Sequence, residues 1–179
     1  MRSILLLTLI AACMPLFAQA QKAHEKPTLK SILLEQLRST HNKAEWFVPA
    51  NTAVAGLSAE QANWTDGKGN HSVGQLVTHL IFWDRRNLDK FEGKPLAKYN
   101  GNNDATFTSF NPSQWNEDVK QLDQVMTEWE NAVQSADENK LQSWYSTIAH
   151  IGTHSAYHIG EIIYVRKEQG SWNPANGVK

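Results

Sequence analysis

The sequence has little cysteine and little net charge. Cys13 is the only cysteine among 179 residues, and it lies in the apolar stretch at the N-terminus. The remainder of the chain therefore has neither a disulfide nor a thiol nucleophile. Basic and acidic residues nearly balance, at 17 and 18. Because binding to phosphate backbones requires a basic surface, we expect no nucleic acid as a partner.

The chain also lacks an apolar run long enough to cross a membrane, which takes about 20 residues. Its longest such run extends from Ile4 to Phe17, follows Arg2 and precedes Ala18-Gln19-Ala20. A basic residue, an apolar core and a small-x-small site, in that order, are typical of a secretory signal peptide. We therefore predict a signal peptide over residues 1–20, a mature protein that begins at Gln21, and export to the periplasm or the exterior.

An alternative interpretation of the N-terminus rests on Cys13. The residues Ile10-Ala11-Ala12-Cys13 resemble a lipobox, which would make the protein a lipoprotein anchored through that cysteine. Cleavage there would leave the apolar Met14-Pro15-Leu16-Phe17 next to the lipid, where a polar tether is expected. The signal peptide is the preferred interpretation.

Residues 21–179 are enough for one well-packed domain and too few for two. Apolar residues recur there at helical spacing, with no alternating strand pattern and no Gly-rich phosphate loop. Ser72 is the expected N-cap of one helix and Gly93 its end. The pattern predicts an all-α four-helix bundle. Its helices are expected over 28–51, 72–92, 112–136 and 144–169, with one short helical turn within 57–64.

Three features outside the main pattern are assigned simple roles. The polar segment 94–111 is interpreted as a crossing between two helices and not as a lid. His41 is expected to face solvent or to be a hydrogen-bonded residue of the core. The acidic residues of the third predicted helix are interpreted as solvated surface; they are Glu117, Asp118, Asp123, Glu128 and Glu130.

The last predicted helix carries three histidines four residues apart, His150, His154 and His158. Residues at this spacing lie on one helix face about 5–6 Å apart, so two neighbouring imidazoles can share one metal ion. Since all three can hardly reach a single ion, another ligand is needed, and His79 is the best complement. The alternative is a core helix whose histidines each bond to a neighbour, but three in one stripe favour a metal.

Two residues near His79 are candidates for a substrate pocket. Trp83, one turn further along the helix, would form an apolar wall, and Arg86 would offer a charge at the mouth. Each also has a simpler interpretation, because a tryptophan is often a core residue and an arginine usually reaches solvent.

Two sequence blocks carry a family resemblance. They are Ser72-Val73-Gly74-Gln75-Leu76-Val77-Thr78-His79-Leu80 and His150-x3-His154-x3-His158-Ile159-Gly160-Glu161, with Arg166 and Gly170 beyond. Together with the connector from Leu57 to Trp64, they resemble the DinB/YfiT-like superfamily over essentially all of residues 21–179. The resemblance implies a divalent metal ion, zinc or nickel before iron or manganese, held by His79, His154 and His158. His150 would lie near the ion without binding it.

The chain departs from the family pattern at Glu161, where glutamine is common. A carboxylate at this position would orient an imidazole from behind. Alternatively, it would bind the ion directly and make it less Lewis acidic. His150 is a second residue expected to act from just outside the ligand set.

The family resemblance implies a thiol transferase or a hydrolase, since a divalent ion can lower the pKa of a bound thiol or water. Thiols used by the transferases are chiefly cytosolic, so predicted export favours a metal-dependent hydrolase that acts on a small molecule. A noncatalytic metal- or ligand-binding module is the alternative from another class, favoured if Glu161 or His150 fills the open coordination position. A haem protein is disfavoured because the chain has no Cys-x-x-Cys-His motif.

The last predicted helix also raises the question of assembly. With His154 and His158 facing inward, Ile148, Ile159 and Ile163 lie beyond the stripe that one bundle interior usually covers. Neighbouring helices would have to cover these isoleucines. If they do not, the leftover apolar patch predicts a homodimer through this helix.

Overall fold

A computed structural model describes residues 26–108 and 110–177. Within these ranges every regular element is helical, which confirms the predicted all-α fold. The predicted signal peptide, its cleavage before Gln21 and Cys13 lie outside the described residues. The four long helices are α1 (Leu29–His41), α4 (Val73–Glu92), α5 (Trp115–Ser135) and α6 (Glu138–Glu168). Shorter elements occupy the connections: α2 (Ala50–Val54), α3 (Ala59–Asn63), η1 (Asp104–Thr106), η2 (Pro112–Gln114) and η3 (Pro174–Asn176).

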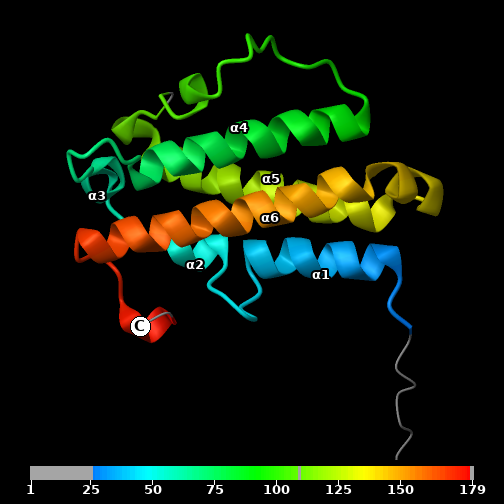
Figure 1. The fold of residues 1–179 in the computed structure, drawn as a ribbon, viewed down its shortest axis with the longest axis horizontal. Coiled ribbons are helices and arrows are strands. Elements are labelled where there is room, and N and C mark those ends of the chain that lie inside the picture. Colours follow the sequence, from blue (N-terminus) through cyan, green and yellow to red (C-terminus); the bar gives the residue numbers. More distant parts are fainter. Residues whose placement is uncertain (1–25, 109, 178–179) are drawn as a thin grey trace, which may run out of the picture.

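The four long helices lie alongside one another as a bundle (Figure 1). Helix α1 packs against α5 and α6, and α4 packs against the same two helices. Burial of each large apolar side chain stabilises such a bundle by about 1.5–3 kcal/mol. The largest fully buried apolar side chains include Leu76, Leu80, Leu122, Trp129, Ile159 and Ile162. Contact between α4 and α6 brings together the two helices that carry the histidine blocks.

Helix α4 begins and ends where the sequence predicts. The Ser72 side chain accepts from the backbone N–H of Gln75, whose own side chain accepts from the Ser72 N–H, and Gly93 ends the helix with a φ of 74°. Gly74 has a packing role, because an added Cβ would lie 2.3 Å from the ring of Phe110. The glycine therefore lets the end of segment 94–111 rest directly on the first turn of α4.

The first predicted helix, 28–51, is wrong in its second half. Helix α1 ends at His41, and α2 begins only at Ala50. A continuous helix cannot pass Pro49, because its ring disfavours helical geometry in the preceding residue and it has no backbone N–H to donate. In the intervening segment the Trp46 side chain is 98% exposed.

The last helix begins earlier than the predicted Trp144. The side chain of Asp137 accepts from the N–H of Lys140, and α6 starts at Glu138. Polar residues up to Ser143 looked like a connector, but Asp137 is a good N-cap and Leu141 anchors the first turns because it is fully buried. Helix α6 thus spans 31 residues.

The isoleucines on which the homodimer prediction depended are core residues. Ile148 and Ile159 are each 1% exposed, and Ile163 is 6% exposed, within a single chain. Helix α6 packs against α1, α2 and α4, so a wider arc of its surface is covered than one stripe. The leftover apolar patch is therefore absent, and the prediction of a dimer through these isoleucines loses its basis.

None of the helices in the described ranges is long and apolar enough to cross a membrane.

Candidate metal centre

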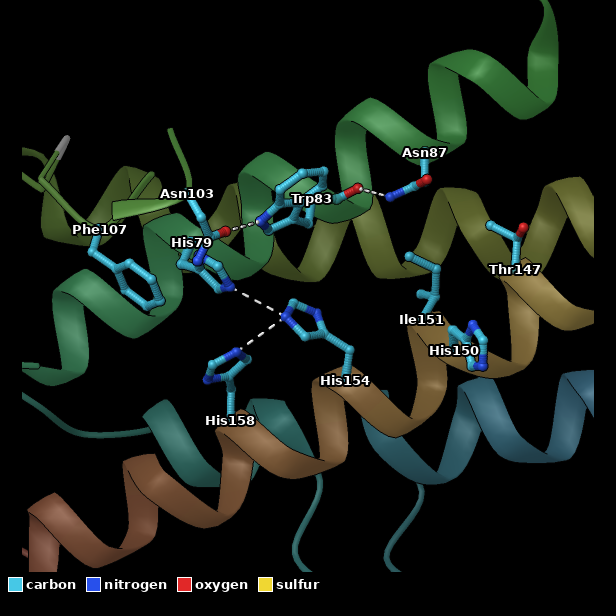
Figure 2. A pocket seen from close by; sticks show the side chains of 10 residues that line it. All are labelled: His79, Trp83, Asn87, Asn103, Phe107, Thr147, His150, Ile151, His154 and His158. Carbon is cyan, nitrogen blue, oxygen red and sulfur yellow. Dashed lines mark hydrogen bonds between the residues drawn. The ribbon is translucent and has the colours of Figure 1, made fainter. Parts of the chain in front are cut away.

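Three histidines from two helices point their Nε2 atoms at one spot (Figure 2). His79 comes from α4, and His154 and His158 come from successive turns of α6. The Nε2 atom of His154 lies 3.1 Å from that of His79 and 3.0 Å from that of His158. The three histidines form a group that could hold a metal ion.

The ring of His79 is oriented by Thr106. Its Nδ1 lies 2.5 Å from the Thr106 hydroxyl oxygen, and that hydroxyl donates to the carbonyl oxygen of Asn103 at 2.6 Å. Because the hydroxyl proton is used there, the hydroxyl oxygen accepts the proton of Nδ1. The Nε2 atom of His79 therefore presents a lone pair to the cluster.

The ring of His158 is oriented in the same way by Glu161. Its Nδ1 donates to a Glu161 carboxylate oxygen at 2.6 Å, one helical turn further along α6. Glu161 thus contacts the side of the ring that faces away from the cluster. Such carboxylate–histidine pairs fix the ring and raise the basicity of the ligating nitrogen.

All three rings are held in the neutral form that a metal needs. Burial, with a smaller contribution from the neighbouring imidazoles, lowers the pKa of His79 to about 3. Burial likewise lowers the pKa of His154 to about 4. The pKa of His158 is also lowered by burial, although hydrogen bonding to Glu161 opposes the shift. At neutral pH the lone pairs are consequently available.

The donor set fits a divalent cation. Because Nδ1 carries the proton in both His79 and His158, neither of their Nε2 atoms can donate a hydrogen bond. The Nε2 atom of His154 would then have to share one proton between both neighbours. A cation would satisfy all three lone pairs. Imidazole nitrogens bound at 2.0–2.1 Å to a tetrahedral zinc ion lie roughly 3.3 Å apart. The separations of 3.0 and 3.1 Å are close to this value.

A stack of rings supports His79 from the side. Phe107 lies parallel to His79 with ring centroids 3.9 Å apart, and His71 lies against the other face of Phe107, also at 3.9 Å. Phe107 is buried and His71 is exposed. The stack excludes water from one side of the histidine cluster.

A pocket of about 500 Å³ opens from the cluster. This volume is within the range of small-molecule sites. Its lining residues come from α4, α6 and the segment between α4 and α5: His79, Trp83, Asn87, Asn103, Phe107, Thr147, His150, Ile151, His154 and His158.

The two predicted pocket residues have different positions. Trp83 lines the pocket, and its indole N–H donates to Asn103 Oδ1 at 3.1 Å. Arg86 does not line it: the guanidinium donates to the Ala97 carbonyl oxygen at 2.7 Å and lies over the ring of Tyr99. The prediction that Arg86 places a charge at the pocket mouth is therefore wrong. The segment 94–111 provides other partners for this side chain.

The segment 94–111 is more than a crossing. It passes over α4 (Figure 1) and supplies Asn103, Thr106 and Phe107 to the site. Helical spacing cannot identify such residues, since they lie in a loop and a short 3-10 turn. The only local signal was the unusual length of the segment.

His41 has the second of its two predicted roles, that of a hydrogen-bonded residue of the core. It is 2% exposed, with Nδ1 2.6 Å from Glu130 Oε1 and Nε2 2.9 Å from Asp123 Oδ1. The interpretation of α5's acidic residues as solvated surface holds for Glu117 and Asp123, which are exposed, although Asp123 also meets His41. Asp118, Glu128 and Glu130 are half-buried, and Glu128 pairs with Arg85.

A family model described as the DinB superfamily matches residues 49–162, more than half of the chain. The chain belongs to the DinB superfamily. The matched range includes the three clustered histidines and Glu161, and it excludes His41. In this DinB-superfamily chain, the histidines therefore lie within the part that defines the family. No curated protein and no solved structure matches the chain.

Proposed function

We propose that the protein is an exported, divalent-metal-dependent enzyme that hydrolyses a small molecule. His79, His154 and His158 would hold the ion, with zinc or nickel as the first candidates. The proposal rests on one observation: three neutral imidazoles converge at the inner end of an open pocket. Membership of the DinB superfamily supports it.

A divalent ion held by these residues would supply Lewis acidity and would make water a nucleophile near neutral pH. The protein's own residues orient the ligands and enclose the site. Thr106 and Glu161 keep the Nδ1 protons of His79 and His158 and so aim both Nε2 atoms inward. Phe107 and Ile151 shield the cluster, while the pocket admits a substrate beside it. Three protein ligands would leave one coordination position open, as in catalytic rather than structural zinc sites.

The open position favours an enzyme over a noncatalytic binding module. Two residues were candidates to fill it. Glu161 bonds to the far side of His158. His150 lies at the other end of the pocket and has no hydrogen bond to the three clustered rings in the described structure (Figure 2).

A metal-dependent thiol S-transferase is the alternative chemistry at the same site. The folded domain has no cysteine, because Cys13 belongs to the predicted signal peptide, so the thiol would have to come from a cosubstrate. Cosubstrates of this kind are chiefly cytosolic. Export therefore argues for hydrolysis, and N-terminal sequencing that finds Gln21 first would support export.

Metal analysis of protein purified without a histidine tag tests the proposal. We expect about one divalent ion per chain, followed by hydrolysis of some ester, amide or lactone in a substrate panel that His158→Ala abolishes. Protein that binds no divalent metal would contradict the proposed function. Metal binding without turnover, but with transfer from an added thiol, would favour the transferase.

A further inference from the structure

The pocket has a second polar end, away from the clustered histidines. Asn87, Thr147 and His150 lie there together (Figure 2). Between this group and the clustered rings lie the apolar surfaces of Trp83 and Ile151. A ligand that fills the pocket therefore meets polar, apolar and polar surfaces in turn.

The groups at the second end are uncharged donors and acceptors. The Asn87 amide donates one proton to the Trp83 carbonyl oxygen at 2.8 Å, which leaves its other proton and its oxygen for a ligand. Thr147 is half-buried, and its hydroxyl has no hydrogen-bond partner among the described residues. His150 is exposed at the rim. Such groups suit an amide or a hydroxyl.

A charged ligand group at this second end would find no opposite charge on the residues that line the pocket. None of the described lining residues is an aspartate, glutamate, lysine or arginine. Arg86, the charge that the sequence suggested, donates to the Ala97 carbonyl oxygen and lies over the ring of Tyr99. Moving a carboxylate or an ammonium group out of water without a partner is costly.

We propose that Asn87 and Thr147 form a specificity subsite for an uncharged, hydrogen-bonding tail of the substrate, such as a carboxamide. The substrate then consists of a carbonyl head at the histidine cluster, a short apolar or aromatic middle against Trp83 and Ile151, and this tail. The inference rests on the proposed function, since the metal places the head.

Hydroxamates test the subsite because they bring a metal-binding head to any chosen tail. Protein loaded with Co²⁺ would be titrated with benzohydroxamate and with its para-carboxamide, para-carboxylate and para-aminomethyl derivatives. We expect the carboxamide to bind about tenfold more tightly than either charged compound, as one or two hydrogen bonds would give. Asn87→Leu with Thr147→Val should remove this preference while leaving the affinity for benzohydroxamate unchanged.

Thr153→Val is the matched control, because Thr153 is an exposed threonine of α6 that does not line the pocket. It should keep the preference. Equal affinity for all tails, or a preference that survives Asn87→Leu with Thr147→Val, would overturn the subsite alone. Failure of the protein to bind Co²⁺ at all would overturn both the subsite and the proposed function.

A second inference concerns the centre of the bundle, where Asp84 is completely buried. Neither of its carboxylate oxygens has a hydrogen-bond partner, and the buried hydroxyl of Ser155 also has none. Both residues line a cavity of about 10 Å³, together with Thr40 and four apolar or aromatic residues, Leu37, Met126, Trp129 and Ile151. Unpaired polar atoms at such a depth are rare.

The cavity has the size and the chemistry for one water molecule. About 10–15 Å³ suffices for a water that finds two to four polar partners. Thr40 donates its hydroxyl proton to the Leu37 carbonyl oxygen at 2.8 Å, so its oxygen can still accept. Among the described residues, no other titratable group lines the cavity from α1, α5 or α6, and the charge that acts on Asp84 is that of Arg85.

We infer that this cavity binds one water molecule, which bridges a protonated Asp84 carboxyl to the hydroxyls of Ser155 and Thr40. The acid donates to the water, and the water donates to the two hydroxyl oxygens. Burial independently raises the pKa of Asp84 to about 8.

Infrared spectroscopy and a crystal structure test this inference. At pH 7 we expect a protonated-carboxyl band that Asp84→Asn removes and that Asp89→Asn, a change on the same helix, leaves in place. A crystal structure should show one water within hydrogen-bonding distance of Asp84 and Ser155, and Ser155→Ala should weaken its density. An empty cavity would overturn the water site. An ionised Asp84 at pH 7, or a melting temperature that falls when choline replaces Na⁺, would overturn the protonated acid in favour of a bound cation.

Discussion

Two histidine sites in this bundle differ in what their ring nitrogens face. His41 joins α1 to α5, and both of its nitrogens meet carboxylate oxygens, those of Glu130 and Asp123. The cluster of His79, His154 and His158 joins α4 to α6, and there the Nε2 atoms meet one another. The first site is complete as it stands, and the second has its lone pairs directed at one another.

The difference shows what distinguishes a structural histidine from a metal ligand. A ring whose two nitrogens both face carboxylate oxygens has its hydrogen-bonding positions occupied and directs no lone pair at a metal site. A ring whose Nδ1 donates to Thr106 or Glu161 is neutral and keeps a lone pair on Nε2. Burial strengthens the contrast, because it lowers the pKa of each clustered ring.

The largest expected effect comes from removing two clustered rings. In a variant with His154→Ala and His158→Ala, stoichiometric metal binding should be lost, because one remaining imidazole cannot hold the ion. Single alanine variants of His79, His154 and His158 should each lose it as well. Metal content after dialysis, measured by atomic emission, reports the result.

Other histidines of the chain provide the controls. His41→Ala should leave metal content unchanged, and His150→Ala should at most weaken binding. Full occupancy in the double variant would mean that the ion binds elsewhere, and the comparison of the two sites would fail.

The two sites should also respond to acid in different pH ranges. The folded-state pKa values of His79, about 3, and His154, about 4, lie below the 6.5 of a free imidazole. Their contribution to stability is therefore full above pH 6.5. It falls towards pH 4, because in this range the imidazoles are protonated in the unfolded chain and not in the folded chain. The hydrogen bond to His41 lowers the pKa of Asp123 below the ordinary value of 3.8. The stability that ionised Asp123 contributes is therefore lost only as the pH falls below about 3.8.

Melting temperatures of metal-free protein between pH 7 and pH 3 would measure these ranges. His154→Gln should flatten the curve between pH 6.5 and pH 4, whereas Asp123→Asn should change it mainly below pH 4. Added metal should raise the melting temperature at pH 7 and at pH 5, where the clustered rings of the folded protein are neutral, and have little effect at pH 3, because protonation then competes with binding. Stabilisation by metal that is as large at pH 3 as at pH 7 would argue against imidazole ligands.

A moderate effect is expected at the other site. His41→Ala leaves the half-buried Glu130 without its closest partner, and we expect a loss of about 1–3 kcal/mol in the free energy of unfolding. Urea denaturation of metal-free protein would measure it. His150→Ala, a change of an exposed histidine, should stay within about 0.5 kcal/mol of the unmodified protein. Equal effects of the two substitutions would show that the His41 hydrogen bonds add little.

The features predicted best from the sequence follow from helical repetition and local caps. Ser72 and Gly93 bound α4 as expected. Spacing on α6 marked the stripe of three histidines, and the family resemblance implied which two of them cluster with His79. The errors arose where local rules compete. Pro49 interrupts a helix that apolar spacing would continue, and Asp137 starts α6 within a polar stretch.

The residues that sequence reasoning missed act through tertiary contacts. Thr106 and Phe107 reach His79 from a segment without periodicity, so no pattern marks them. His41 meets its carboxylates only because α1 packs on α5, which a single helical wheel cannot show. Ile159 and Ile163 are covered because α6 has neighbours on several sides.

The smallest expected effect concerns the residue that departs from the family pattern. Glu161→Gln keeps an oxygen that accepts from Nδ1 of His158 but removes its charge, so the imidazole becomes slightly less basic. We expect metal affinity to fall by about tenfold, at the low end of the 10–100-fold range for such partners. Glu161→Leu, which removes the acceptor, should reach the upper end, and the exposed Glu168→Gln should have no effect. Competition with a fluorescent chelator would give the three affinities. Complete loss of binding in Glu161→Gln would instead place the carboxylate on the ion, since only a ligand is indispensable and a supporting partner is not.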